Sequence, residues 1–133
     1  MAVSPYKGIP TGHERILFVD DDQALVDIGR QMLEHLGYEL VTRTSSIEAL
    51  ELFKADPDGF DLIITDMTMP NMTGDKLAKA VMKIRHDIPI ILCTGFSERI
   101  TEENVWKIGI KKLVMKPLVI RDLAEAIREV LGN

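Results

Sequence analysis

The sequence has one cysteine, few aromatic residues and no excess of positive charge. A single cysteine, Cys93, cannot form an internal disulfide, which fits a reducing cytoplasm. An aromatic content of 5% disfavours a base-stacking platform, and a net charge of −5 argues against direct nucleic-acid binding. The sequence also lacks an apolar run long enough for a membrane span, and its N-terminus lacks a secretory pattern. We therefore expect a cytoplasmic domain without membrane contact.

The remaining composition is that of a globular chain. Its 133 residues are 46% hydrophobic and 28% charged, which is enough for one domain with a real core. Residues 1–14 contain Pro5, Gly8, Pro10 and Gly12 with almost no apolar periodicity, which predicts a linker or tag. The folded domain is predicted over residues 15–133.

From Arg15 onward, short apolar runs alternate with helical patterns. Strands are predicted at 16–19, 39–43, 62–65, 90–93 and 112–115, with a helix after each. Asp22 is a plausible N-cap of the first helix, whose apolar stripe is Leu25, Ile28, Met32, Leu33 and Leu36. The third helix is expected to bury Leu77, Val81 and Ile84. This alternation predicts an α/β fold with a parallel sheet and helices on both faces.

Most of the predicted strands end in a residue with useful chemistry. These residues are Asp20 and Asp21, Asp66, Thr94 and Lys116. In a parallel sheet the carboxyl ends of the strands lie at one edge, where open α/β sheets place their sites. The sequence therefore predicts one site that contains all five side chains.

Three carboxylates at one site repel each other and require a cation. Oxygen ligands of this kind suit Mg²⁺, with Mn²⁺ as a substitute. Lys116 could balance a dianionic group as a point charge, and the Thr94 hydroxyl could donate a hydrogen bond. Such a site suits a phosphoryl group, and Asp66 is the carboxylate best placed to attack it and form an aspartyl phosphate.

These motifs resemble those of the receiver domain of two-component response regulators. The matching segments are 16–22 for the first strand and acid pair, 66–74 for the phosphoacceptor segment, 94–95 for the switch hydroxyl and 116–117 for a lysine–proline pair. The resemblance covers about residues 14–131. It implies a flavodoxin-like doubly wound sheet of five parallel strands in the order 2-1-3-4-5, with five helices.

The resemblance also implies a role for each matching residue. Asp66 would be the phosphoacceptor, and the metal ligands would be Asp21, Asp66, the backbone carbonyl of Thr68, and Asp20 through water. Thr94, Lys116 and the backbone N–H groups of Met67 and Gly95 would hold the phosphoryl group, and the bond before Pro117 would be cis. The donor would be a histidine kinase or a phosphotransfer domain. The chain would be a monomer or weak dimer with at most slow self-dephosphorylation.

Some positions depart from the family pattern. Leu113 stands where many receivers carry an aromatic residue that responds to the switch hydroxyl, so we expect its output to be coupled differently. Thr68 and Phe96 occupy the variable positions that the resemblance links to dephosphorylation rate. Trp106 is equally compatible with a partner-binding face and with core packing.

Alternative functions remain open at this level. The stretch 12–17 after the linker resembles the start of the C-terminal receiver of a hybrid sensor histidine kinase; a freestanding regulator is the alternative. A Mg²⁺-dependent phosphatase of the haloacid-dehalogenase type would use similar groups, but it places its nucleophile on the first strand. A receiver that serves only as a docking surface and a flavodoxin-like FMN carrier are further alternatives.

Overall fold

The computed structural model describes residues 6–95 and 100–132. The elements are, in chain order, β1 (Arg15–Val19), α1 (Gln23–His35), β2 (Glu39–Arg43), α2 (Ser46–Ala55), a 3₁₀ turn η1 (Pro57–Gly59), β3 (Leu62–Asp66), α3 (Gly74–Ile84), β4 (Ile90–Thr94), α4 (Glu102–Ile108), β5 (Lys112–Met115) and α5 (Ile120–Leu131). The predicted alternation of strands and helices is confirmed.

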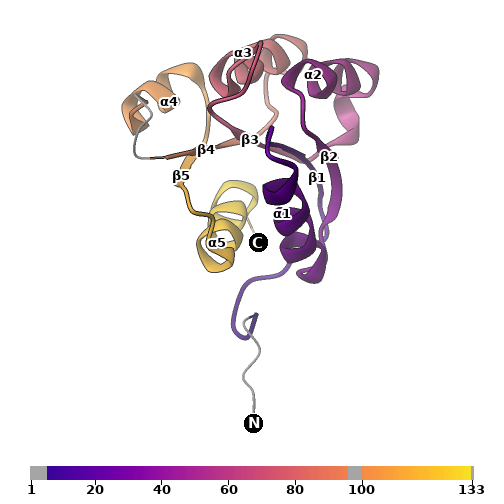
Figure 1. The fold of residues 1–133 in the computed structure, drawn as a ribbon, viewed down its shortest axis with the longest axis vertical. Coiled ribbons are helices and arrows are strands. Elements are labelled where there is room, and N and C mark those ends of the chain that lie inside the picture. The colour runs from indigo at the N-terminus through magenta and orange to yellow at the C-terminus, as the bar shows by residue number, and fades with distance from the viewer. Residues whose placement is uncertain (1–5, 96–99, 133) are drawn as a thin grey trace.

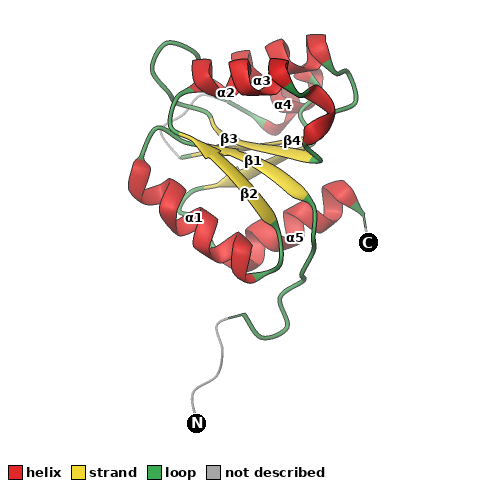
Figure 2. Cartoon of the chain, turned by 90° about the vertical axis from the view of Figure 1, so that its right-hand side faces the viewer, coloured by secondary structure: helices red, strands yellow, loops and turns green. Residues whose placement is uncertain are grey.

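In the described part of the chain, five parallel strands form one sheet in the order β2-β1-β3-β4-β5. Helices α1 and α5 cover one face, and α2, α3 and α4 cover the other (Figures 1 and 2). Fold and strand order therefore agree with the prediction. The register aligns Asp66 with Cys93 and Thr94 with Met115, which brings the ends of β3, β4 and β5 to one edge.

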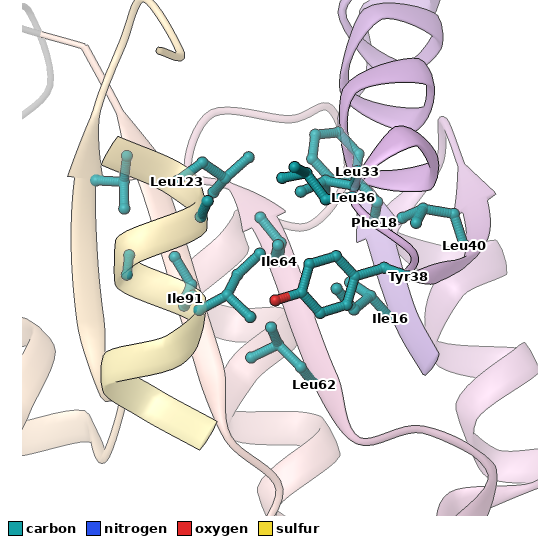
Figure 3. Close-up of a cluster of buried hydrophobic side chains, with 14 of the residues drawn as sticks. Ile16, Phe18, Leu33, Leu36, Tyr38, Leu40, Leu62, Ile64, Ile91 and Leu123 are labelled. Atoms are coloured by element: carbon teal, nitrogen blue, oxygen red, sulfur yellow. The ribbon is translucent and has the colours of Figure 1, made fainter. Parts of the chain in front are cut away.

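The sheet is buried on both faces, as expected for parallel strands between two helical layers. Strands β3 and β4 are buried along their whole length. On the face covered by α1 and α5, the core contains Ile16, Phe18, Leu33, Tyr38, Leu62, Ile64, Ile91 and Leu123 (Figure 3). The opposite face packs another cluster around Leu17, Phe53, Ile63, Leu77 and Leu92. This packing gives the strand ends a rigid support.

The predicted helix starts at α1 and α2 are confirmed by their caps. The Asp22 side chain accepts a hydrogen bond from the N–H of Ala24 at 3.0 Å. The Ser45 hydroxyl accepts one from the N–H of Glu48 at 3.2 Å. Each cap satisfies a backbone donor that the first helical turn leaves unpaired. Asp22 is thus engaged as a cap, the role that the sequence pattern favoured.

Two predicted core residues are exposed instead. Ile28 is 52% exposed and Ile84 is 40% exposed. The buried residues of α1 are Val26, Gly29 and Leu33, and Leu36 just after the helix is buried too. Of the predicted stripe, Leu33 and Leu36 are therefore confirmed, whereas Leu25 and Met32 are only half-buried. At Gly29 the helix lies so close to the sheet that a Cβ atom would come within 2.7 Å of the Phe18 ring. This close approach sets the rotation of α1 and leaves Ile28 on the surface.

The predicted linker needs correction from Tyr6 onward. Ile9 is only 7% exposed and belongs to the core, and Tyr6 packs against the same cluster. The N–H of Gly12 donates to the carbonyl of Leu36 at 3.1 Å. These contacts are invisible to a local pattern, because the partners lie on distant segments. Residues 6–14 therefore form part of the folded domain.

The segment before β1 also reaches α5 through a largely buried ion pair. Arg128 lies 2.6 Å from the Glu14 carboxylate, and the two side chains are 15% and 17% exposed. Burial alone would raise the pKa of Glu14, but the hydrogen bond from Arg128, the backbone hydrogen bonds and the positive charge of Arg128 together outweigh burial and lower the pKa. Arg128 also lies over the ring of Tyr38. The pair joins the start of the domain to the last turns of α5.

Candidate functional site

The chemically active residues lie at the carboxyl ends of the strands. Asp20 directly follows β1, Asp66 ends β3, Thr94 ends β4 and Lys116 directly follows β5. Asp20, Asp66 and Thr94 are 2%, 5% and 2% exposed. Buried polar groups of this kind are rare unless they are paired or functional. Since their strands are neighbours in the sheet, the fold gathers these residues as the sequence predicted.

Lys116 connects two of the carboxylates directly. Its Nζ lies 3.0 Å from Oδ2 of Asp20 and 2.9 Å from Oδ1 of Asp66. The backbone N–H of Lys116 donates to the carbonyl of Thr94 at 2.7 Å, which fixes the start of this side chain against β4. The ammonium group is thus held between the ends of β1 and β3, although Lys116 directly follows β5.

This environment keeps Lys116 charged. Burial by itself would lower the pKa of Lys116, because it disfavours the cation. The hydrogen bonds to Asp66 and Asp20, together with their negative charge, act in the opposite direction and raise the pKa above its usual range. A permanent cation therefore lies next to the Asp66 carboxylate at neutral pH.

The acidic cluster is suited to a divalent cation. Ligand oxygens of Asp20, Asp21 and Asp66 all lie within 4.8 Å of one another. Two unit charges at that distance repel by about 3 kcal/mol at an effective dielectric constant of 20. Three carboxylates and one ammonium leave a net charge of about −2, and the donors are all oxygen, the ligand type of Mg²⁺ and Mn²⁺. The residues present therefore fit such an ion.

Asp20 and Asp21 differ in how they could bind the ion. Oδ1 of Asp20 accepts a hydrogen bond from the N–H of Asp22 at 2.9 Å, while Oδ2 contacts Lys116. Because both of its oxygens already have partners, Asp20 is better suited to contact through water. Asp21 is exposed at the same edge of the sheet, so its carboxylate is better suited than that of Asp20 to coordinate an ion directly.

The loop after Asp66 is held close to the site. The N–H of Gly74 donates to the carbonyl of Met67 at 2.8 Å. A Cβ atom at Gly74 would lie 2.1 Å from the carbonyl oxygen of Asp66, so only glycine fits there. Asn71 adopts a positive φ of 70°, a turn conformation that asparagine tolerates and that the sequence analysis missed. This geometry fixes the backbone that carries Thr68.

One predicted phosphoryl contact conflicts with the structure. The N–H of Met67 donates to the carbonyl of Cys93 at 2.9 Å and so continues the pairing of β3 with β4. A group used in the sheet cannot also hold a phosphoryl oxygen, so the role of Met67 is dropped. The bond between Lys116 and Pro117 is cis, as the resemblance implied.

Three further positions singled out in the sequence are Trp106, Leu113 and Phe96. Trp106 is 63% exposed, so it does not serve core packing. Leu113 is half-buried and packs against the core cluster between the sheet and α2, α3 and α4. Phe96, one of the positions linked to dephosphorylation rate, lies outside the described residues.

A groove beside the site was missed by the sequence analysis. It has a volume of about 490 Å³ and is lined by Leu25, Ile28 and Met32 of α1 and by Lys116 and Leu118. The first three belong to the stripe that was predicted to be buried. The adjacent pairs Leu25-Val26 and Met32-Leu33 were a sequence signal that α1 has apolar residues on two faces.

A comparison with protein-family models matches residues 16–128 to the response regulator receiver domain. The chain belongs to this family. The match contains all of Asp20, Asp21, Asp66, Thr94 and Lys116. Receivers are generally phosphoacceptor signalling modules rather than catalytic enzymes, they bind Mg²⁺ at an acidic pocket, and they interact with histidine kinases or phosphotransfer proteins.

Curated relatives support this assignment. The chain is 34% identical over 109 residues to the two-component response regulator ARR12 of Arabidopsis thaliana, covering 82% of this chain and 18% of that protein. It is 32% identical over 116 residues to the response regulator SaeR of Staphylococcus aureus, covering 87% of this chain and 50% of that protein. The receiver thus spans half or less of the length of these relatives.

Solved structures give the same result. A receiver domain protein from Clostridium thermocellum superimposes with a TM-score of 0.85 and 29% identity, covering 90% of this chain and 94% of that one. A CheY-like receiver from Methanospirillum hungatei gives a TM-score of 0.79 and 34% identity, with the same coverage of both chains. Within the described residues of this receiver, no helix is long and apolar enough to cross a membrane.

Proposed function

We propose that Asp66 accepts a phosphoryl group from a phosphohistidine donor. The observation that carries the proposal is the Lys116 ammonium, which contacts both Asp66 and Asp20 at the edge of the sheet. In the reaction, a carboxylate oxygen of Asp66 forms a bond to phosphorus as the bond from phosphorus to the donor's imidazole nitrogen breaks. The imidazole leaves with the electron pair of that bond, and Asp66 becomes an acyl phosphate.

The surrounding groups would stabilise charge during the transfer. Lys116 would exchange part of its contact with the carboxylates for a contact with the phosphoryl oxygens. The Thr94 hydroxyl, one residue past the register partner of Asp66 on β4, would donate a hydrogen bond to another oxygen. The N–H of Gly95 directly follows it and would serve the same purpose. Together these donors spread the charge of the transferred group.

The metal proposed for this site is Mg²⁺, or Mn²⁺ in its place. Asp21 and Asp66 would bind it directly, Asp20 would bind through water, and the backbone carbonyl of Thr68 would complete the protein ligands. When bound, the ion neutralises the acidic cluster and the incoming phosphoryl oxygens. Because Asp66 is both a ligand and the nucleophile, phosphorylation would depend on the metal.

The groove along α1 is the proposed contact surface for the donor protein. It begins at Lys116, which also contacts Asp66, so a protein seated in the groove is beside the nucleophile. Its walls are apolar, and Ile28 is exposed within it. A helix with an apolar face and a histidine near one end fits this surface, and such packing would position the phosphohistidine for transfer. The partner is therefore a histidine kinase or a phosphotransfer domain.

The test is incubation with acetyl phosphate and MgCl₂, followed by intact mass measurement. We expect one phosphoryl adduct on the wild type, and no adduct with excess EDTA or in Asp66→Asn. Asp58→Asn is the matched control, because Asp58 is an exposed carboxylate on the 3₁₀ turn and should leave labelling unchanged. An adduct that persists in Asp66→Asn would overturn the assignment of the nucleophile.

We further propose that this receiver is part of a hybrid sensor histidine kinase in the cytoplasm. The packed segment 6–14 supports this proposal, because it would join a preceding domain firmly to the receiver. A freestanding regulator is the alternative. Sequencing the native transcript would separate them: a kinase core encoded upstream in the same reading frame supports the hybrid, and its absence refutes it.

A further inference from the structure

The segment from Tyr6 to Ile9 bridges two helices on one face of the sheet. The ring of Tyr6 stacks on His35, the last residue of α1, with the centroids 3.9 Å apart. Nη2 of Arg121, in the first turn of α5, donates to the carbonyl of Lys7 at 3.4 Å. The N–H of Ile9 donates to the carbonyl of Tyr6 at 3.1 Å, which closes a turn over the buried Ile9 side chain. We call residues 6–9 the strap.

The strap borders the groove that begins at the phosphorylation site. His35 follows the groove residue Met32 by one turn of α1, and Arg121 follows the groove residue Leu118 by three positions. The strap contacts both of these flanking residues, so it lies just beyond the residues that line the groove. Both views show the segment before β1 on the side of α1 and α5 (Figures 1 and 2).

Two features indicate that the strap is more than a passive tail. It presents the partly exposed ring of Tyr6 and the exposed Lys7 at the end of an apolar surface. It also links α1, which lines the groove, to α5 through the contacts of Tyr6 with His35 and of Lys7 with Arg121. A binding surface held in its bound shape loses less freedom when the partner docks, and so binds more tightly.

We propose that the strap forms part of the docking surface for the phosphohistidine donor protein and controls how fast that donor phosphorylates Asp66. The inference rests on the proposed function, because it concerns the same nucleophile. It adds a second requirement, which a small donor does not share. Acetyl phosphate is small enough to reach Asp66 without packing on α1, whereas we expect a protein donor to pack along α1 and to contact Tyr6.

The experiment compares two donors on the same variants. The probes are acetyl phosphate and a histidine phosphotransfer domain prelabelled with ³²P on its histidine. Tyr6→Ala removes the stacked ring, and Tyr6→Phe keeps it as the matched control. Arg121→Gln removes the other anchor, and Arg30→Gln is its control, because Arg30 is an exposed arginine that pairs with Glu34 along α1. Thermal unfolding is measured for each variant to confirm that the domain remains folded.

We expect Tyr6→Ala to slow labelling by the protein donor by about fivefold, the size of effect that loss of one aromatic pair gives. Arg121→Gln should slow it in the same direction, and both controls should behave as wild type. Labelling by acetyl phosphate should be unchanged in every variant. Equal or faster transfer from the protein donor to Tyr6→Ala would overturn the role of the strap. If neither donor labels the wild type, it is the proposed function that fails.

Discussion

The acidic cluster predicts that Asp21 lowers stability without metal and raises it with metal. Asp21 lies with Asp20 and Asp66 in a group whose oxygens are within 4.8 Å of one another. In Asp21→Asn one of the repelling charges is removed, so the metal-free variant should be more stable than the wild type. The same change removes a proposed direct ligand, so Mg²⁺ should stabilise the variant much less.

The magnitudes follow from the geometry. Each repulsion at this distance is about 3 kcal/mol at an effective dielectric constant of 20, but solvent around the exposed Asp21 screens it to a total of about 1 kcal/mol. Mg²⁺ at 100 times its dissociation constant adds about 2.7 kcal/mol to the wild type. For a domain of this size that is a rise in Tm of about 10 °C, whereas the metal-free variant starts about 3 °C above the wild type.

The assay is thermal unfolding by circular dichroism, in EDTA and across a MgCl₂ titration. Asp22→Asn is the matched control, because Asp22 is the next residue, is exposed, and acts as the N-cap of α1. Asparagine caps helices about as well as aspartate, so this variant should keep the fold and the full response to Mg²⁺. The two stability curves of wild type and Asp21→Asn should cross as Mg²⁺ is added.

A specific result would refute this reasoning. If Asp21→Asn shows the same Mg²⁺-dependent rise in Tm as the wild type, Asp21 is not a ligand. If Asp22→Asn loses the response instead, the first helix cap and the metal ligand have been assigned the wrong way round. If the metal-free variant is no more stable than the wild type, the acidic cluster is not strained by repulsion.

Three further predictions concern the lysine, the buried ion pair and the loop glycine. The folded-state pKa of Lys116 is raised, so its ion pairs stabilise the fold fully below the ordinary lysine pKa of about 10.4, and this stabilisation is lost as the pH rises through the folded-state pKa. In urea unfolding with EDTA, the free energy of unfolding of the wild type should exceed that of Lys116→Met by less at pH 11 than at pH 8. Glu14→Gln should lower the free energy of unfolding in urea at pH 7 by about 3 kcal/mol, because it leaves a buried arginine charge unpaired, while Glu39→Gln at an exposed position should lower it by less than about 0.5 kcal/mol. Since the pKa of Glu14 is lowered in the folded state, its contribution should be lost as the pH falls below the ordinary pKa of a glutamate. Equal losses for both variants would contradict the pairing. Gly74→Ala should lower stability by about 1–3 kcal/mol in thermal unfolding, although helix propensity alone favours alanine by about 1 kcal/mol; an unchanged Tm would show that the loop can shift.

The fold could be predicted because its signals are local. Apolar runs such as 62–65 and 90–93 read as buried strands, and the caps at Asp22 and Ser45 marked helix starts that the structure confirms. Parallel topology then follows from the alternation of strands and helices, since each crossover is right-handed. The strand order itself came from the resemblance to the family.

The rotation of α1 could not be predicted in this way. The sequence offers apolar residues on two faces, and either could have been buried. The contact of Gly29 with Phe18 decides which face turns inward, and it joins residues from two elements. The exposed position of Ile28, and with it the groove beside Lys116, is a consequence of that contact.

The chemical groups that meet at the edge of the sheet could be read from the sequence, because the ends of parallel strands have to lie together. The folded structure was needed to show how those groups are connected: Lys116 bridges Asp20 and Asp66, and the N–H of Met67 is used by the sheet. It also decided that the chain from Tyr6 onward packs on α1 and α5. The physical reason is the same in each case, since side-chain pairing and packing depend on distances between segments that no local pattern encodes.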